Sequence, residues 1–282
     1  MVPQTPRRPV LRAARGLALT THPGPAVAVT ALSALLSRAA SLPLSRGSRV
    51  ITAVGCGQLV IGWTNDLVDV QRDRAVERAD KPLAKGDVSP VAVGSAATLA
   101  AVSCVVASLG CGRRSGLTHL GLVGCGVAYN LGLKSTWWSF APYALAFGSL
   151  PSVATLAAPS PALAPWPTTA GAALLGVGAH LVNALPDLED DEATGVAGLP
   201  HRLGERRTRQ LVGAVLLGST LVLLAGRRPL RRADLAPLAA TLALVPPAVR
   251  TRGRSSLAAV VAIAGVDVAL LGRGRPRKDP RR

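Results

Sequence analysis

Aromatic residues are scarce in this chain of 282 residues, where Phe, Trp and Tyr together make up 3%. Cysteine is also rare, and the four thiols form no CxxC pair and have no histidine at metal-ligand spacing. The sequence therefore indicates neither a zinc site nor a disulfide framework. The chain has fifteen acidic residues and 32 Lys and Arg residues. Because acidic residues are few, a cluster of them in one segment is unusual.

Long apolar runs are abundant, and 49% of the residues are hydrophobic. Several runs extend over about 17 to 22 residues with few or no charges, which is the length that spans a bilayer. The net charge of +17 would favour a nucleic-acid-binding protein if the basic residues lay along one face. They lie instead between the apolar runs. We therefore expect an all-α, polytopic membrane protein without a nucleic-acid partner.

Nine transmembrane helices can be placed on these runs, in a single membrane domain over residues 23–272. A basic cytoplasmic tail, residues 1–22, precedes this domain, and a second basic tail, residues 273–282, follows it. Pro246 and Pro247 predict that the eighth helix is kinked or short. The expected spans cover residues 25–44, 50–67, 91–110, 117–133, 139–158, 169–186, 210–226, 235–250 and 256–272.

Loop charges predict the orientation of the first six spans. With the N-terminus in the cytoplasm, the inside segments carry fourteen Lys and Arg residues and the outside loops carry four. This asymmetry follows the positive-inside rule. The orientation of the last three spans stays open, because four arginines after the seventh span would lie outside: Arg227, Arg228, Arg231 and Arg232.

Eleven of the fifteen acids gather in two short segments, residues 66–87 and 187–192. These segments follow the second and the sixth spans. Both spans are even-numbered, so both clusters emerge on the same face of the membrane, which we place in the cytoplasm. The acids are Asp66, Asp69, Asp73, Glu77, Asp80 and Asp87 in the first cluster, and Asp187, Glu189, Asp190, Asp191 and Glu192 in the second.

The two clusters share a spacing. In each, one asparagine and two aspartates stand four residues apart, which places them on one face of a helix. Like charges at this spacing repel, and a helix C-terminus already carries partial negative charge. A cation would remove both penalties, and oxygen ligands without Cys or His suit Mg²⁺. If the clusters are instead solvated loops, their acids pair with nearby bases. The two sets are Asn65, Asp69 and Asp73, and Asn183, Asp187 and Asp191.

Basic residues follow both clusters, and one more, Lys134, ends the fourth span on the same face of the membrane; together they complete a set that suits a diphosphate. Mg²⁺ together with Arg and Lys is the usual combination that holds a diphosphate and stabilises it as it leaves. Each basic residue taken alone is equally consistent with an anchor that follows the positive-inside rule. The residues are Arg78, Lys81, Lys85, Lys134 and Arg202.

At these residues the chain resembles the UbiA superfamily of intramembrane prenyltransferases, over residues 20–272. The family motif NDxxDxxxD is matched by residues 65–73, and the motif DxxxD by residues 187–191. Three further family segments are similar here: YxxxLK at 129–134, LPxRLG at 199–204 and, loosely, RPxRPL at 78–83, where this chain reads RADKPL.

The resemblance implies nine helices around a central cavity that opens sideways to lipid, and two Mg²⁺ ions that hold an isoprenoid diphosphate. It assigns metal binding to Asn65, Asp66, Asp69, Asp73, Asp187 and Asp191, of which the five aspartates are the catalytic set. It assigns substrate binding to Asn65, Arg78, Lys81, Tyr129, Lys134, Asn183 and Arg202.

The expected activity is that of a prenyltransferase, which moves an isoprenoid chain from an allylic diphosphate to a small acceptor. An aromatic compound is the first expectation for this acceptor. The same diphosphate site without an acceptor would make a membrane terpene cyclase, and an ion-coupled transporter is a third class with buried acids. A carboxylated acceptor would need an Arg or Lys in the cavity, for which Arg38 is one candidate. Trp137 and Trp138 fit interface anchors better than ligands of a carbocation.

Overall fold

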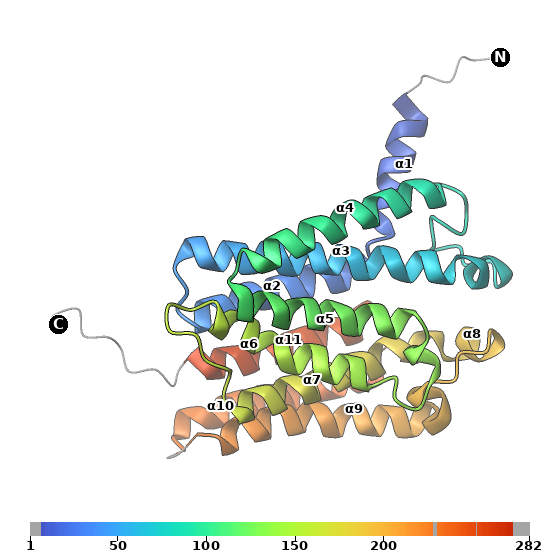
Figure 1. The fold of residues 1–282 in the computed structure, drawn as a ribbon. Helices are drawn as coiled ribbons and strands as arrows, with labels where there is room; N and C mark the ends of the chain where they lie inside the picture. Colours follow the sequence, from blue (N-terminus) through green and yellow to red (C-terminus); the bar gives the residue numbers. More distant parts are fainter. Residues whose placement is uncertain (1–6, 228–229, 252, 273–282) are drawn as a thin grey trace, which may run out of the picture.

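The structure, a computed structural model, describes residues 7–227, 230–251 and 253–272, and these residues form helices and connections without a strand. The predicted C-terminal tail, residues 273–282, lies outside the described residues. Within these ranges, nine helices of at least sixteen residues lie side by side with roughly parallel axes (Figure 1). They are α2 (Pro23–Ala39), α3 (Leu44–Ala75), α4 (Pro90–Leu109), α5 (Arg113–Asn130), α6 (Ala141–Leu156), α7 (Trp166–Ala184), α9 (Leu199–Ala225), α10 (Leu235–Arg250) and α11 (Arg254–Gly272).

Each of the nine spans expected from the sequence coincides with one of these helices. α3 is the longest, and its 32 residues rise about 48 Å, against about 30 Å for the hydrocarbon core of a bilayer. It is therefore long enough to carry its C-terminal acids beyond that core. Among the described helices, four could cross a membrane by length and composition alone: Pro90–Leu109, Trp166–Ala193, Leu199–Ala225 and Arg254–Gly272.

Prolines mark the beginnings of several helices, where the fixed φ suits the helix and a missing N–H costs nothing. Pro23 begins α2, and Pro90 begins α4 directly after the Ser89 cap, whose hydroxyl accepts from Ala92 N at 3.1 Å. Two prolines lie inside α10, which is one of the two shortest of the nine helices at 16 residues. The prediction of a short eighth span is thus confirmed.

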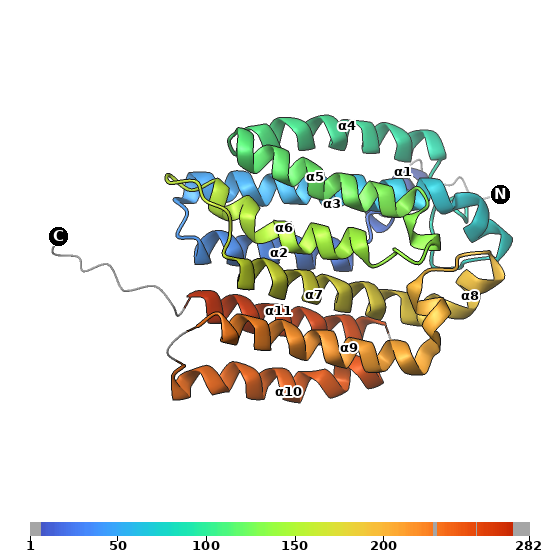
Figure 2. The same ribbon diagram turned by 60° about the horizontal axis from the view of Figure 1, so that its bottom comes forward.

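The expected central cavity is present, and among the described helices six surround it while three lie outside this ring. α2, α3, α5, α6, α7 and α11 all contribute lining residues, and α2 packs against α11 to close the ring. α4 packs outside on α3 and α5, whereas α9 packs on α7 and α11, and α10 on α9 and α11. Figure 2 shows α4 and α10 on opposite sides of the bundle.

The two acid-bearing segments lie at one end of the bundle. The C-terminal end of α3 and the short helices η2 (Leu185–Asp187) and α8 (Leu188–Ala193) share the right-hand end in Figures 1 and 2. The predicted N-terminal tail contains a further helix, α1 (Arg7–Leu19). It is tied to the bundle because Trp63 Nε1 donates to the Leu17 carbonyl oxygen at 3.0 Å.

Gly176 lets α6 and α7 approach closely beside the cavity. A Cβ atom at this position would lie 2.5 Å from the Tyr143 carbonyl oxygen and 2.7 Å from Phe147 Cβ. We expect Gly176→Ala to destabilise the protein by about 1 to 3 kcal/mol, because the two helices must move apart. In α5, a Cβ at Gly121 meets nothing within 4 Å, so Gly121→Ala is the control and should not destabilise. Thermal unfolding in detergent compares the two, and equal midpoints would contradict the close packing.

Candidate active site

Three aspartates form a stripe along the C-terminal third of α3. Asp66, Asp69 and Asp73 are 2%, 7% and 8% exposed, respectively. Residues three, four and seven apart face the same side of a helix, so the three carboxyl groups lie in one row. Buried carboxylates so close together require nearby cations.

Asp66 meets two cationic or hydrogen-bonding partners through one of its oxygens. Its Oδ1 accepts from Lys81 Nζ at 2.7 Å and lies 2.7 Å from His22 Nε2. Lys81 belongs to the loop after α3, and His22 precedes α2 with a φ of 53°. The other oxygen, Oδ2, is buried and has no hydrogen-bond partner among the described residues. Asp66 therefore offers a buried acceptor atom to a ligand.

Asp69 is the most heavily contacted carboxylate of the row. Lys134 Nζ lies 2.5 Å from both of its oxygens, Arg72 donates at 2.8 Å, and Asn65 Nδ2 donates at 3.1 Å. Lys134 lies in the short helix η1 (Leu133–Ser135) after α5 and is 8% exposed. The same asparagine amide lies 3.3 Å from Asn130 Oδ1, so α5 is fixed against α3 beside the acids.

The second acidic cluster does not lie on one regular helix, and that expectation is wrong. α7 ends at Ala184, and the chain passes through the 3-10 helix η2 into the six-residue α8. Pro186 lies in η2 and cannot donate a backbone hydrogen bond, which explains the change of helix. Asn183 lies in α7 and lines the cavity, whereas Asp187 is the last residue of η2 and Asp191 lies in α8.

Arg78 joins the two clusters. Its Nη1 donates to Asp187 Oδ1 at 3.1 Å, although the two residues are 109 positions apart. Its Nε and Nη2 donate to the two oxygens of Asp80 at 2.9 and 3.0 Å. These bonds hold the pKa of the Asp80 carboxyl below its usual range and raise the pKa of the Arg78 guanidinium. Beyond them, Asp191 Oδ2 lies 3.4 Å from His201 Nε2.

The chemistry of the carboxylates suits Mg²⁺. Within the described ranges, no three His, Cys, Asp or Glu side chains are grouped closely enough to hold a metal ion as they stand. The carboxylates of α3 contact Lys81, Lys134 and Arg72 instead. Their donor atoms are all oxygens, and Asp66 Oδ2 is a buried oxygen without a partner, so the residues fit a hard divalent cation.

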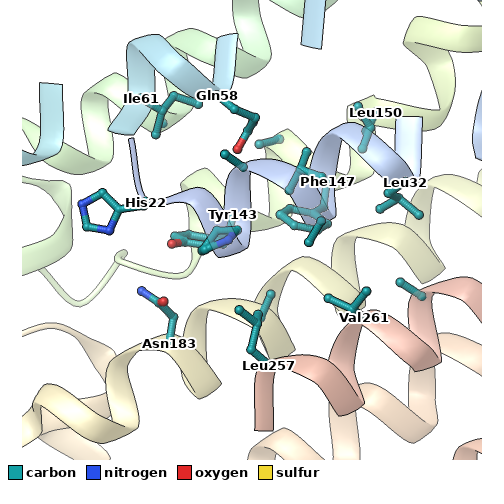
Figure 3. A pocket seen from close by; sticks show the side chains of 18 of the residues that line it. His22, Leu32, Gln58, Ile61, Tyr143, Phe147, Leu150, Asn183, Leu257 and Val261 are labelled. Atoms are coloured by element: carbon teal, nitrogen blue, oxygen red, sulfur yellow. The ribbon is translucent and has the colours of Figure 1, made fainter. Parts of the chain in front are cut away.

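A cavity of about 260 Å³ adjoins the acids of α3. His22 and Asn65, which contact Asp66 and Asp69, belong to its lining, so the cavity has a polar end at the carboxylates. Figure 3 shows His22 and Asn183 at this end. At the other end it shows the aliphatic side chains of Leu32, Leu150 and Val261. The cavity thus joins a polar head region to an apolar chamber.

Three of the eight aromatic residues of the chain line this cavity. The chain has two tyrosines and two phenylalanines, and both tyrosines and Phe147 line the cavity. Tyr143 meets Tyr129 edge-on at 5.2 Å between ring centroids and stacks on Phe147 at 6.3 Å. By contrast, Trp137 and Trp138 are 50% and 63% exposed, which agrees with their expected role as interface anchors.

The sequence model of the UbiA prenyltransferase family matches residues 26–267, which is most of the chain. This protein belongs to the UbiA prenyltransferase family. The resemblance drawn from the two aspartate motifs is thereby confirmed. No curated protein sequence gives a match.

Solved structures of UbiA homologues share the fold. An apo homologue from Aeropyrum pernix K1 is 14% identical with a TM-score of 0.71, over 92% of this chain and 97% of that one. A homologue from Archaeoglobus fulgidus bound to GPP and Mg²⁺ is 16% identical with a TM-score of 0.69, over 91% and 98%. A digeranylgeranylglyceryl phosphate synthase is 14% identical with a TM-score of 0.61, over 93% and 98%.

Within the described part of this UbiA-family structure, Arg202, a predicted substrate-binding residue, contacts neither the acids nor the cavity. It is exposed, and its Nε donates to the Ala197 carbonyl oxygen at 3.1 Å. Among the described side chains, none of the acids in the two clusters pairs with it. Gly204, the last residue of the LPxRLG segment, has a φ of 74° and interrupts α9 two residues after Arg202. A role for Arg202 in substrate binding stays a prediction.

Sequence reasoning missed two residues of the site. His22 contacts Asp66 from 44 positions away, and no spacing rule connects the two. Asn130 directly follows Tyr129 in the YxxxLK segment, and its Nδ2 donates to the Ile61 carbonyl oxygen at 2.9 Å. Its place in that segment was the one available signal.

Proposed function

We propose that this protein transfers an isoprenoid chain from an allylic diphosphate to a small acceptor within the membrane, in a reaction that requires Mg²⁺. One observation carries the proposal: the buried carboxylates of α3 lie at the polar end of an apolar cavity, and Arg78, in the loop after α3, reaches Asp187 of the second cluster. Such a site suits a molecule with an anionic head and a long apolar tail. The archaeal homologue bound to GPP and Mg²⁺ supports the same class of substrate.

The head of this substrate would bind at the two acidic clusters. Bound Mg²⁺ neutralises the charge of a diphosphate and so eases its departure. Lys81, Lys134 and Arg78 already reach between the carboxylates, and we propose that they donate to phosphate oxygens when the substrate is present. Two ions would be held by Asn65, Asp66, Asp69, Asp73, Asp187 and Asp191.

The transfer itself exchanges one bond for another. The bond between C1 of the isoprenoid and the diphosphate oxygen breaks, and its electron pair leaves with the diphosphate. C1 then bonds to a nucleophilic atom of the acceptor, which loses a proton. The rings of Tyr129, Tyr143 and Phe147 can stabilise positive charge on the allylic carbons. The aliphatic lining excludes water, which would otherwise capture C1.

Diphosphate release tests this function. Purified full-length protein in phospholipid vesicles is supplied with Mg²⁺ and isoprenoid diphosphates of increasing chain length, with and without small phenolic acceptors. We expect release that stops when EDTA removes Mg²⁺, returns with added Mg²⁺, and yields a prenylated acceptor. Release at an unchanged rate without acceptor, with a cyclic hydrocarbon product, would instead indicate a terpene cyclase. No release from any diphosphate would refute the proposal.

We also propose that the acid-rich end faces the cytoplasm, because its loops carry most of the basic residues of the first six spans. A cysteine introduced by Lys85→Cys at this exposed position reports the side. In intact cells, a thiol reagent that cannot cross membranes should leave it unlabelled and should label it after the cells are opened. The parent protein, with its four native thiols, is the blank. Equal labelling of intact and opened cells would reverse the orientation.

A further inference from the structure

Gln58 places an amide on the wall of the cavity, away from the acids. Its side chain points into the cavity from α3 (Figure 3), and it has no hydrogen-bond partner in the part of the chain that the structure describes. A polar group held in this way loses a hydrogen bond unless water or a ligand supplies one. The amide nitrogen and the amide oxygen of Gln58 are thus available to donate and accept hydrogen bonds inside the cavity.

The cavity wall carries no formal charge beside this amide. Among the described residues, no Arg, Lys, Asp or Glu side chain lines the cavity. Arg38, the candidate partner for a carboxylated acceptor, is exposed and does not belong to the lining. A carboxylate that entered here would therefore lose its hydration without gaining a counter-ion.

The position of Gln58 suits contact with an acceptor. Gln58 and Asn65 are seven residues apart on α3, which is close to two turns, so they share a face and are separated by about 10.5 Å along the axis. Asn65 marks the diphosphate end of the cavity, because it donates to Asp69. Both amides line the same cavity, so a group bound at Gln58 would lie in the cavity that ends at Asn65.

We infer that the acceptor carries an uncharged polar substituent, such as an amide or a hydroxyl, which Gln58 hydrogen-bonds, and that a carboxylated acceptor is a poor substrate. This inference rests on the proposed transfer reaction and adds the substrate class to it. Gln58 determines specificity by pairing with the substituent, while the acids and cations of the polar end act on the diphosphate.

Two matched probes isolate the substituent: 4-hydroxybenzamide, which is neutral, and 4-hydroxybenzoate, which is charged. With either probe, the C1–O bond of the diphosphate breaks, a ring carbon next to the hydroxyl bonds to C1, and the displaced ring proton passes to solvent. The step is the same, so a difference in kcat/KM reports the para substituent. We expect the wild-type protein to use the amide at least about tenfold better.

Variants of Gln58 test whether this residue sets the preference. Gln58→Arg supplies a counter-charge and a bidentate donor, so the ratio of kcat/KM values should shift at least about tenfold toward the carboxylate. Gln58→Leu removes the hydrogen bond and should lower the use of the amide mainly by raising KM. Gln210→Arg makes the same substitution at an exposed position of α9 and should leave the ratio unchanged.

Each outcome decides the inference. A wild-type preference for the carboxylate, or an unchanged ratio in Gln58→Arg that still releases diphosphate, overturns it. If Gln58→Arg does not fold, Gln58→Leu decides alone, and an undiminished preference for the amide overturns it. Diphosphate release without prenylation of either probe also overturns it while leaving the diphosphate site intact. If Mg²⁺ supports no release from any isoprenoid diphosphate, the proposed function fails first.

Discussion

Replacing Asp66 by asparagine is expected to lower the rate of Mg²⁺-dependent diphosphate release about 10³-fold. Asp66 is 2% exposed, and its Oδ2 lacks a hydrogen-bond partner among the described residues, so its charge is available to a metal ion. Asparagine keeps the shape but removes the charge. A fall of about 10³-fold corresponds to about 4 kcal/mol of transition-state stabilisation, as expected for one polar group in a dry site. Initial rates of diphosphate release at saturating substrate measure it.

Asp267→Asn is the matched control. Asp267 is also buried, at 5% exposed, but it lies in α11 and accepts from Ser219 Oγ at 2.8 Å and Thr220 Oγ1 at 2.7 Å. Asparagine can keep hydrogen bonds with both hydroxyls, so this variant should retain its activity within about threefold. Equal losses in the two variants would mean that Asp66 acts through the stability of the bundle and not at the diphosphate.

Replacing Lys134 by methionine should lower both activity and stability. Lys134 is 8% exposed and contacts both oxygens of Asp69. In the variant, Asp69 would keep only Arg72 and Asn65 as partners. We expect diphosphate release to fall about 10²-fold and the free energy of unfolding to fall by about 3 to 5 kcal/mol. Release assays and thermal unfolding in detergent follow the two effects. Lys85→Met removes an exposed lysine of the same end and should change neither.

A double variant separates the two roles of Lys134. Asp69→Asn combined with Lys134→Met removes both charges of the buried pair, so it should regain much of the stability that Lys134→Met loses. Its activity should stay as low as that of either single variant, because the diphosphate has lost a cation and the metal a carboxylate. Recovery of activity together with stability would show that Lys134 serves only to balance Asp69.

The helices of this protein could be predicted because a bilayer leaves the backbone few alternatives. A chain in lipid must satisfy its own N–H and C=O groups, so each long apolar run becomes a helix. The nine runs chosen from the sequence all coincide with helices. The helix α1 lies in a basic segment that is too short and too charged to span a membrane. A search for long apolar runs therefore did not reveal it.

The site was predictable where its residues follow one another at helical spacing. Asp66, Asp69 and Asp73 share a face of α3 because the helix continues past them. The same rule failed at Asp187 and Asp191, where Pro186 ends the regular helix after Ala184. That proline was visible in the sequence, but the repeated spacing of asparagine and aspartate outweighed it.

The contacts of the site depend on tertiary packing that no spacing reveals. Lys134 reaches Asp69 from 65 residues away, and His22 reaches Asp66 from 44 residues away. The lining of the cavity is set by which faces of six helices turn inward. Gln58 illustrates this limit, since seven residues before Asn65 it reads as an ordinary polar residue in an apolar run.

The location of a bound metal ion relative to both clusters is the most direct test of the account. Crystals grown with Mn²⁺ and a non-cleavable thiodiphosphate analogue of an isoprenoid diphosphate would give anomalous peaks at the metal positions. We expect manganese between carboxylates of α3 and those of Asp187 or Asp191, with diphosphate oxygens completing its ligands. Metal held by the acids of α3 alone, with Asp187 and Asp191 out of reach of metal and diphosphate, would contradict the shared site on which the proposed reaction depends.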